Sequence, residues 1–332
     1  MLVTNNTDIS LSLAVWLLHD EYDYDSADNY ISVTRLMRPL RQIVLPMRNF
    51  DKKSPDLEDY IARALGKSLH DSIEKAWKNS YKSALAMLGY PEEAINRVMI
   101  NPTLEQLQAA ENPIPVYLEQ RDRRKIKVGR TEYTVGGKFD IVLDGIVHDN
   151  KSTSVWKYIL RNNDDEYALQ MSQYRWINAA SDHPKITQDF GRVNFIFTDW
   201  QKFQSKQIAN YPTKRTETID VPLLSLEETE AWIVRKLELY EKFKNTPEPL
   251  LPECSDEELW RSETKYKYYA DATKTSGKST KNFDSLKDAN AFLVEKGNKG
   301  IVLTVPGEPK RCGYCDAFDV CSQRKRYFPD ND

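Results

Sequence analysis

The longest regular hydrophobic pattern in the chain lies between Asp56 and Leu88. Apolar side chains recur there at every fourth residue with charges between them, at Leu57, Ile61, Leu65, Leu69, Ile73 and Trp77. That spacing places them along one side of a long helix. Residues 155–160, 164–180 and 223–243 predict three more helices, and the acidic start of the second suits the positive end of a helix dipole.

Short apolar runs replace this pattern between residues 114 and 151, and they predict a β-meander. The expected strands lie near residues 116–119, 125–128, 139–143 and 146–151, with a further strand at 192–197. Asp144-Gly145 is a two-residue sequence that closes a β-hairpin between the last two strands of the meander. The order helix, meander, helix, strand predicts an α/β fold.

The two ends of the chain carry weaker signals. Ile31–Met47 predicts a short kinked helix or a helix pair, because Pro39 interrupts it and Ser32 can cap it. Residues 245–253 read as a linker, and a strand near 266–269, a helix at 285–296 and a strand at 301–305 follow. We therefore expect an N-terminal extension over 1–30, a core over 31–245 and a C-terminal region over 246–332.

Composition narrows the class of protein. The chain has 332 residues and a formal net charge of −3, so any contact with nucleic acid must depend on local basic patches. The early apolar run at Leu11–Leu18 is too short to span a bilayer and lacks the features of a secretion signal. We expect a soluble, cytoplasmic protein.

The four cysteines are Cys254, Cys312, Cys315 and Cys321. Three lie close together near the C-terminus, which favours a metal site over a disulfide framework in a protein without a secretion signal. A structural zinc site usually shows two paired cysteine motifs, and only one pair exists here. The spacing favours a [4Fe–4S] cluster, with structural Zn²⁺ or unmetallated thiols as alternatives.

The hairpin around Asp144-Gly145 carries candidate chemistry. Asp140 lies on its first strand, and Asp149 and Lys151 lie on its second, two residues apart and therefore on one face. Acids on a buried sheet face are costly unless they hold a cation. Two carboxylates and a lysine around a hard metal ion can turn water into a nucleophile against a phosphodiester.

The neighbouring helices and two basic stretches complete the set of candidates. Gly66 and His70 share one helix face, as do Gln170 and Tyr174. A glycine within a helix costs about 1 kcal/mol relative to alanine, which suggests that something approaches Gly66 closely. The basic residues that could contact DNA phosphates are Arg121, Arg123, Arg124, Lys125 and Lys127 in the meander and Arg324, Lys325 and Arg326 near the C-terminus. A solvated hairpin tip and packing around a metal site are the respective alternatives.

In this order, the motifs Gly66-x-x-x-His70, Gly137-x-x-Asp140, Asp149-x-Lys151 and Gln170-x-x-x-Tyr174 resemble the RecB-like branch of the PD-(D/E)xK nucleases. That branch includes AddB nuclease domains, phage exonucleases and CRISPR-associated RecB-like exonucleases. The resemblance covers about residues 31–200. It implies a restriction-endonuclease-like core, a central mixed β-sheet flanked by helices, with a C-terminal cysteine-containing α+β extension.

The resemblance also implies roles for individual residues. Asp140, Asp149, His70 and the backbone carbonyl of Asn150 would bind Mg²⁺ or Mn²⁺. Lys151 would activate the attacking water. Gln170 and Tyr174 would brace the side chain of Lys151 or contact a DNA phosphate. Glu74 and Glu119 are candidates for the outer shell of the metal. In AddB and the CRISPR-associated enzymes a fourth cysteine lies near the start of the domain, where this chain has Arg38-Pro39.

The activity expected from this resemblance is metal-dependent hydrolysis of DNA, with an exonuclease favoured. Linear single- or double-stranded DNA would be the substrate, in recombination, processing or defence associated with phages or mobile elements. A helicase or recombination protein would be a separate partner. The alternatives are a DNA endonuclease and a non-catalytic DNA-binding or assembly module that retains the fold.

Overall fold

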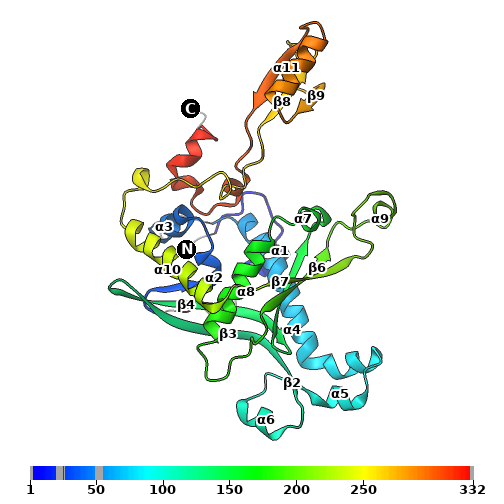
Figure 1. Cartoon of the computed structure of the whole chain (residues 1–332), viewed down its shortest axis with the longest axis vertical. Coiled ribbons are helices and arrows are strands. Elements are labelled where there is room, and N and C mark those ends of the chain that lie inside the picture. Colours follow the sequence, from blue (N-terminus) through cyan, green and yellow to red (C-terminus); the bar gives the residue numbers. More distant parts are fainter. Residues whose placement is uncertain (1–2, 20–24, 26, 49–54, 330–332) are drawn as a thin grey trace. The chain divides into compact units, whose positions relative to one another are not determined.

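The structure is a computed structural model that describes residues 3–19, 25, 27–48 and 55–329. The chain forms two compact units, one of Met1–Met37 with Lys52–Glu238 and the other of Arg38–Asp51 with Leu239–Asp332 (Figure 1). We call them unit 1 and unit 2. Some of the N-terminal extension expected over 1–30 lies outside the described residues, and the rest includes helix α1 (Leu11–Leu18).

Unit 1 is built on a seven-stranded mixed sheet. Six strands pair in chain order, and they are β2 (Val98–Ile100), β3 (Ile114–Val128), β4 (Thr131–Leu143), β5 (Ile146–Thr153), β6 (Phe190–Phe197) and β7 (Thr216–Pro222). The seventh, β1 (Tyr30–Ser32), pairs with β4 in parallel. The β2–β3 and β5–β6 pairs are also parallel, and the remaining pairs are antiparallel. The expected α/β class with a central mixed sheet is confirmed.

Helices flank this sheet. They are α2 (Val33–Leu36), η2 (Leu57–Tyr60), α4 (Ile61–Met87), α5 (Glu92–Arg97), α6 (Leu104–Ala109), α7 (Val155–Leu160), α8 (Asp164–Asn178), α9 (Gln204–Gln207) and α10 (Leu226–Phe243), whose last residues belong to unit 2. Trp77 of α4 packs on a cluster that contains Ile141. The next residue, Val142, pairs with Val147, which lies next to Met171 of α8 at Gly191. Because neighbouring strand residues face opposite sides, α4 and α8 cover opposite faces of the sheet.

Along β4, the regular alternation of side chains between the two faces of the sheet is interrupted beside the predicted site. Ile141 and its partner Leu118 pack with α4, whereas Phe139, two residues earlier, packs with α8. Residues two apart on a regular strand face the same side. The break coincides with Glu119, whose φ of +53° is uncommon for a residue with a side chain. Asp140 lies opposite Glu119 in the register of β3 and β4. The Asp140 carboxylate therefore lies where side chains two residues apart change from one face of the sheet to the other.

The two strands of the hairpin also part at this level. The turn Asp144-Gly145 has positive φ angles of 51° and 78°, which is the conformation expected for a two-residue hairpin turn. Pairing of β4 with β5 ends at Ile141 and His148. Asp140 and Asp149 are the next residues on the two strands, so both acids emerge where the strands separate.

Unit 2 contains the cysteines and a small separate sheet. Its elements are α3 (Leu40–Arg48), η3 (Glu248–Leu250), β8 (Lys265–Tyr269), β9 (Lys281–Phe283), α11 (Leu286–Glu295), β10 (Ile301–Val305), η4 (Lys310–Tyr314), η5 (Phe318–Val320) and η6 (Ser322–Arg326). The sheet has the order β10–β8–β9 and is antiparallel. A core of Val44, Leu45, Leu251 and Ala317 joins α3 to the C-terminal segment. The expected C-terminal α+β extension with cysteines is confirmed.

Several expectations about individual elements need correction. The two strands expected over 116–128 are one continuous strand, β3, because β4 pairs along nearly all of it. Strands β1, β2, β7 and β9 were not expected, since each is defined by its pairing partner rather than by a strong pattern of its own. The apolar positions of α4 are not a buried stripe within the described structure: Leu65 is 58% exposed, and no residue of α4 is fully buried.

Candidate active site

The two acids and the lysine of the hairpin meet in one cavity of unit 1. Asp149 and Lys151 project from the α8 side of β5, and Lys151 Nζ lies 2.8 Å from Asp149 Oδ2. Asp140 lines the same cavity of about 170 Å³ from β4. The residue Asp149 is only 6% exposed. A carboxylate this deeply buried needs positive charge beside it, and Lys151 supplies part of that charge.

His70 approaches the acids from α4. Its Nδ1 atom lies 2.8 Å from Asp140 Oδ2, and the ring lines the same cavity. Contact with Asp140 raises the pKa of His70 above its ordinary value, although burial opposes the change. Gly66, one helical turn earlier, has no atom within 4 Å of the position that a Cβ would take. The close approach expected at Gly66 is therefore wrong for the atoms described here.

Gln170 and Tyr174 approach the cavity from α8. Gln170 Nε2 donates a hydrogen bond of 2.9 Å to the Tyr174 hydroxyl, so the two side chains act as one unit. A Cβ at Gly137 would lie 2.6 Å from Tyr174 Cε1. Only glycine fits at this point of β4, because the Tyr174 ring lies directly against the strand. The glycine of the Gly137-x-x-Asp140 motif thus sets the distance of α8 from the acids.

Two further residues of the cavity region were missed by the sequence analysis. His148 lines the cavity, and its buried Nε2 atom has no hydrogen-bond partner among the described residues. Burial lowers the pKa of His148 to about 4, so its ring is neutral near pH 7. Tyr167 of α8 lies with its ring centroid 5.6 Å from Lys151 Nζ. Burial raises the pKa of Tyr167 to about 12, which keeps the phenol neutral. The available sequence signals were the position of His148 directly before Asp149 and that of Tyr167 nearly one helical turn before Gln170.

A second, smaller cavity adjoins the first on the α4 side. Its lining includes Glu74, Glu119, Asp140 and Asn150, together with His70. Burial raises the pKa of Glu119, and the ammonium of Lys138 pairs with this carboxylate and opposes the change. Asn150 Oδ1 accepts a hydrogen bond of 3.0 Å from Asn194 Nδ2. The outer-shell candidates therefore lie beside the acids, and the side chain of Asn150 is engaged elsewhere.

The donor set of the first cavity fits a divalent cation in chemical type. Carboxylates and one imidazole are ligands for Mg²⁺ or Mn²⁺. His70 Nδ1 and Asp149 Oδ2 are buried and have no hydrogen bond of good geometry, despite their charged neighbours. Within the described part of the chain, no three His, Cys, Asp or Glu side chains are already arranged to hold a metal ion. A cation would therefore have to replace the contacts that His70 and Lys151 make with the acids.

The basic residues of the meander are mostly engaged within unit 1. The guanidinium of Arg124 lies 4.1 Å from the Trp176 ring and donates to the Trp176 carbonyl and to Glu230. Lys125 pairs with Glu132 at 2.7 Å. Arg123 lies 3.8 Å from Asp25. Of these three, Arg124 is committed to internal packing.

The four cysteines line one cavity of unit 2. Cys254, Cys312, Cys315 and Cys321 face it together with Arg41, and none forms a disulfide. Burial raises the pKa of Cys254 to about 12 and that of Cys315 to about 11. To bind a metal ion as thiolates, Cys254 and Cys315 would therefore have to lose their protons to it.

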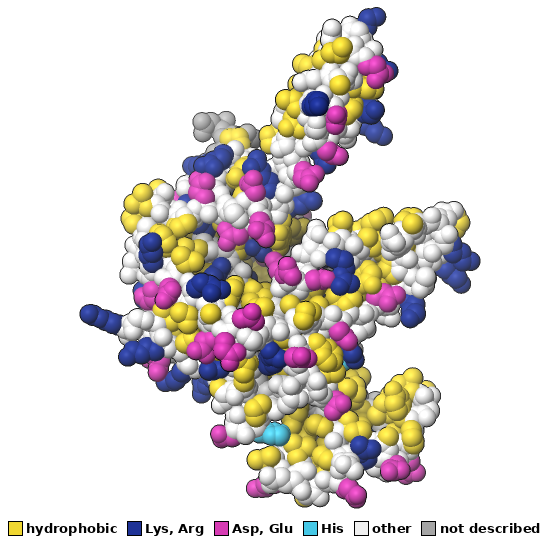
Figure 2. Space-filling model, viewed as in Figure 1, with side chains coloured by type: hydrophobic (Ala, Val, Ile, Leu, Met, Phe, Trp, Pro, Cys, Tyr) yellow, Lys and Arg dark blue, Asp and Glu magenta, His cyan; other side chains and the backbone are white. Residues whose placement is uncertain are grey.

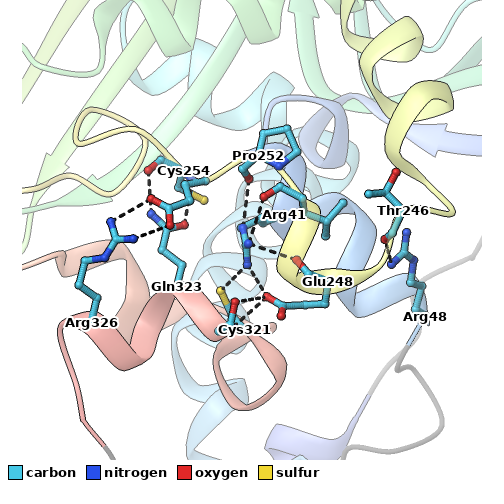
Figure 3. Close-up of polar contacts among 12 residues, drawn as sticks. Arg41, Arg48, Thr246, Glu248, Pro252, Cys254, Cys321, Gln323 and Arg326 are labelled. Carbon is cyan, nitrogen blue, oxygen red and sulfur yellow. Dashed lines mark hydrogen bonds and ion pairs between the residues drawn. The ribbon is translucent and has the colours of Figure 1, made fainter.

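Polar contacts hold the cysteine segments in place (Figure 3). Gln323 accepts from the amide of Cys254 and donates to its carbonyl, at 2.8 and 2.9 Å. Arg41 Nη1 lies 3.4 Å from Cys321 Sγ. Arg326 pairs with Glu253 at 2.6 Å. These contacts keep the isolated Cys254 next to the C-terminal cysteines across about 60 intervening residues of sequence.

Comparisons with known proteins give limited similarity. No family model and no curated protein match the chain. The crystal structure of SSO0001 is 18% identical, covers 71% of this chain and 87% of its own, and gives a TM-score of 0.44. The crystal structure of a phage-related exonuclease from Haemophilus somnus 129PT is 14% identical, covers 54% of this chain and 80% of its own, and gives a TM-score of 0.24. TM-scores below 0.5 do not establish a shared fold, so the fold class given above depends on the topology of this chain.

Among the described residues, no helix combines the length and the apolar character required to cross a bilayer.

Proposed function

We propose that this protein is a metal-dependent deoxyribonuclease that degrades linear DNA from its ends. The observation that carries the proposal is the position of Asp140 and Asp149. Both acids emerge where β4 and β5 part, and Lys151 lies 2.8 Å from Asp149 in the cavity that they share. Asp149 is buried and the charged groups beside it are only partly exposed. Such an arrangement costs stability, which favours a chemical role for these groups.

Asp140, Asp149, His70 and the Asn150 carbonyl would hold Mg²⁺ or Mn²⁺. When bound, the cation supplies Lewis-acid activation of water and charge neutralisation at the phosphate. Lys151 orients the attacking water and offsets the charge that develops on the phosphate. The hydrogen-bonded pair Gln170–Tyr174 fixes the opposite wall of the cavity, and the Tyr167 ring under Lys151 holds its ammonium in place.

A cleavage assay with matched variants tests this function. End-labelled linear DNA is incubated with protein and Mg²⁺ or Mn²⁺, and Lys151→Met and Asp149→Asn are compared with wild type. We expect each variant to lose at least about a hundredfold in rate. Asp144→Asn is the control, because this hairpin carboxylate lies outside the cavity and asparagine tolerates its positive φ. Equal rates for wild type and Lys151→Met contradict the proposal.

Two alternatives give different results in the same assay. Cleavage of covalently closed circular DNA indicates an endonuclease, because an exonuclease needs a free end. DNA binding without cation-dependent cleavage indicates an assembly or binding module. The intact set of two acids and one lysine favours an enzyme over such a module, as binding alone requires no buried carboxylates. A setting in phage or mobile-element DNA recombination or defence is part of the same proposal.

We also propose that the four cysteines hold a [4Fe–4S] cluster, with structural Zn²⁺ as the alternative. Four thiols line one cavity, none of them forms a disulfide, and burial raises the pKa of Cys254 and Cys315, so these two do not act as free thiolate nucleophiles. The absorbance spectrum of anaerobically purified protein, with iron, sulfide and zinc analysis, distinguishes the two. A Cys312→Ser variant should lose most of the bound metal. Wild-type protein that carries neither metal contradicts the proposal.

A further inference from the structure

A small lobe of unit 2 has a charge opposite to that of the whole chain. It comprises Lys265–Val305, which form β8, β9, α11 and β10. This segment contains eight lysines and four acids, a net charge of +4, whereas the whole chain carries −3. We call it the lysine lobe. On the face shown in Figure 2, its basic side chains lie at the tip and along one edge.

Most of these lysines lack acidic partners. Lys265 pairs with Asp284, Lys274 with Asp271, and Lys296 with Glu295. The other five lysines make no ion pair with any described residue, and they are Lys267, Lys278, Lys281, Lys287 and Lys299. The lobe therefore presents uncompensated positive charge to solvent.

Two of the lysines place their ammonium groups over one aromatic ring. Lys281 Nζ lies 4.4 Å and Lys296 Nζ 4.9 Å from the centroid of the Phe292 ring, so the two nitrogens are at most about 9.3 Å apart. The Phe292 ring packs edge-on against Tyr268, whose hydroxyl donates a 2.7 Å hydrogen bond to the Lys299 carbonyl. Lys296 is already paired with Glu295, so Lys281 carries the uncompensated charge at this ring, where it would attract an anion.

The β8–β9 loop adds neutral donors to this surface. Residues 271–280 contain three threonines, two serines and two lysines around Gly277, where a Cβ would meet nothing within 4 Å. Hydroxyl groups, backbone amides and lysines are the groups that contact DNA phosphates without reading sequence. The lobe has only two exposed large apolar side chains, Leu286 and Val294, too few for the core of an ordinary protein interface.

We propose that the lysine lobe binds the sugar-phosphate backbone of DNA and adds affinity for the substrate outside the active site. The choice of DNA as the polyanion depends on the proposed nuclease function. Each phosphate contact contributes about 0.7 to 0.9 to the slope of log affinity against log salt concentration. Removal of three contacts should therefore make that slope about 2 to 3 less steep.

The test is fluorescence anisotropy of labelled DNA with the full chain. The background is Lys151→Met in EDTA, so no cleavage takes place. The triple variant Lys278→Ala, Lys281→Met, Lys299→Ala should bind at least tenfold more weakly and with the shallower salt slope. Methionine at 281 preserves the packing on Phe292, and the corresponding arginine triple variant should bind like the parent.

The control is Lys202→Ala, Lys206→Ala, Lys214→Ala, which removes the same charge from exposed lysines of the β6–β7 segment in unit 1. Equal binding by the two alanine-containing triple variants, or an unchanged salt slope in the lobe variant, overturns the proposal. The two proposals fail separately. Lobe-dependent DNA binding by a protein that does not cleave contradicts only the nuclease function, and cleavage with lobe-independent binding contradicts only the lobe.

Discussion

Replacement of Arg41 by methionine should destabilise unit 2 far more than a typical surface substitution. The guanidinium donates to Glu248 Oε1 at 2.5 Å, to the carbonyls of Pro252 and Leu251 at 3.1 Å each, and to the Glu248 carbonyl at 3.3 Å (Figure 3). A fifth contact reaches Cys321 Sγ at 3.4 Å. Arg41 is 3% exposed, so water cannot replace these bonds without local opening.

The magnitude follows from what the substitution leaves behind. Loss of one partner of a buried ion pair costs about 3–5 kcal/mol, because the remaining charge is buried and unpaired. The Glu248 side chain is 22% exposed and keeps hydrogen bonds from the amide and hydroxyl of Ser322. We therefore expect the lower end, about 3 kcal/mol, which corresponds to roughly a hundredfold change in an opening equilibrium.

Native-state hydrogen exchange measures this opening without assuming that both units unfold together. Peptides that cover residues 248–254 and 318–327 should exchange about a hundredfold faster in Arg41→Met. Arg192→Met is the control, because Arg192 forms a similar ion pair with Asp220 at the surface, where such pairs contribute under about 1 kcal/mol. If Arg41→Met accelerates exchange no more than this control does in unit 1, the reasoning from burial is wrong.

Three further predictions follow from single positions. Gly137→Ala places a Cβ 2.6 Å from the Tyr174 ring, so it should cost about 1–3 kcal/mol in thermal unfolding and slow DNA cleavage at least tenfold; an unchanged rate contradicts the tight packing. Gly66→Ala meets open space and should stabilise α4 by about 1 kcal/mol, and a lower melting temperature would show that the space is filled. Burial alone would raise the pKa of Glu248, but hydrogen bonds from Ser322 and Arg41 lower it below the ordinary 4.5. Its stabilising contribution is therefore present above about pH 4.5 and lost as the pH falls through the lowered pKa, so the urea midpoint of wild type should drop more between about pH 5 and pH 3 than that of Glu248→Gln.

The sequence predicts those parts of the fold that depend on local signals. The Asp144-Gly145 turn was predictable because few residue pairs adopt two successive positive φ angles. Helix α8 was predictable from its acidic start and spacing. Strand β7 was not, because its apolar pattern is short, with only Ile219 and Val221 buried, and its register is set by β6. The continuity of β3 likewise depends on its pairing with β4. The residues of β3 alone do not carry that information.

Some residues of the candidate site could likewise be predicted from local sequence, and the environments of others could not. Asp140, Asp149 and Lys151 follow from the hairpin pattern, and His70, Gln170 and Tyr174 were added only by a resemblance in the order of the motifs. The structure brings all six to one cavity. The charge of Arg124 suggested a phosphate contact, but pairing with Glu230 and the Trp176 ring depends on residues that are distant in sequence. The net charge of a short stretch of sequence cannot distinguish an arginine that is free to contact phosphate from one that packs inside the protein.

In the cysteine region, one arginine joins helix α3 to the C-terminal segment through hydrogen bonds. Arg41 donates to Cys321 Sγ at 3.4 Å and to Glu248 Oε1 at 2.5 Å, and it lines the cavity that the four thiols share. The arginine therefore holds α3 against the C-terminal segment without serving as a ligand, so α3 should stay attached when the metal is removed. Chelation should then loosen the cysteine loops while leaving the exchange protection of α3 largely intact, whereas Arg41→Met should expose α3 even in the metal-loaded protein.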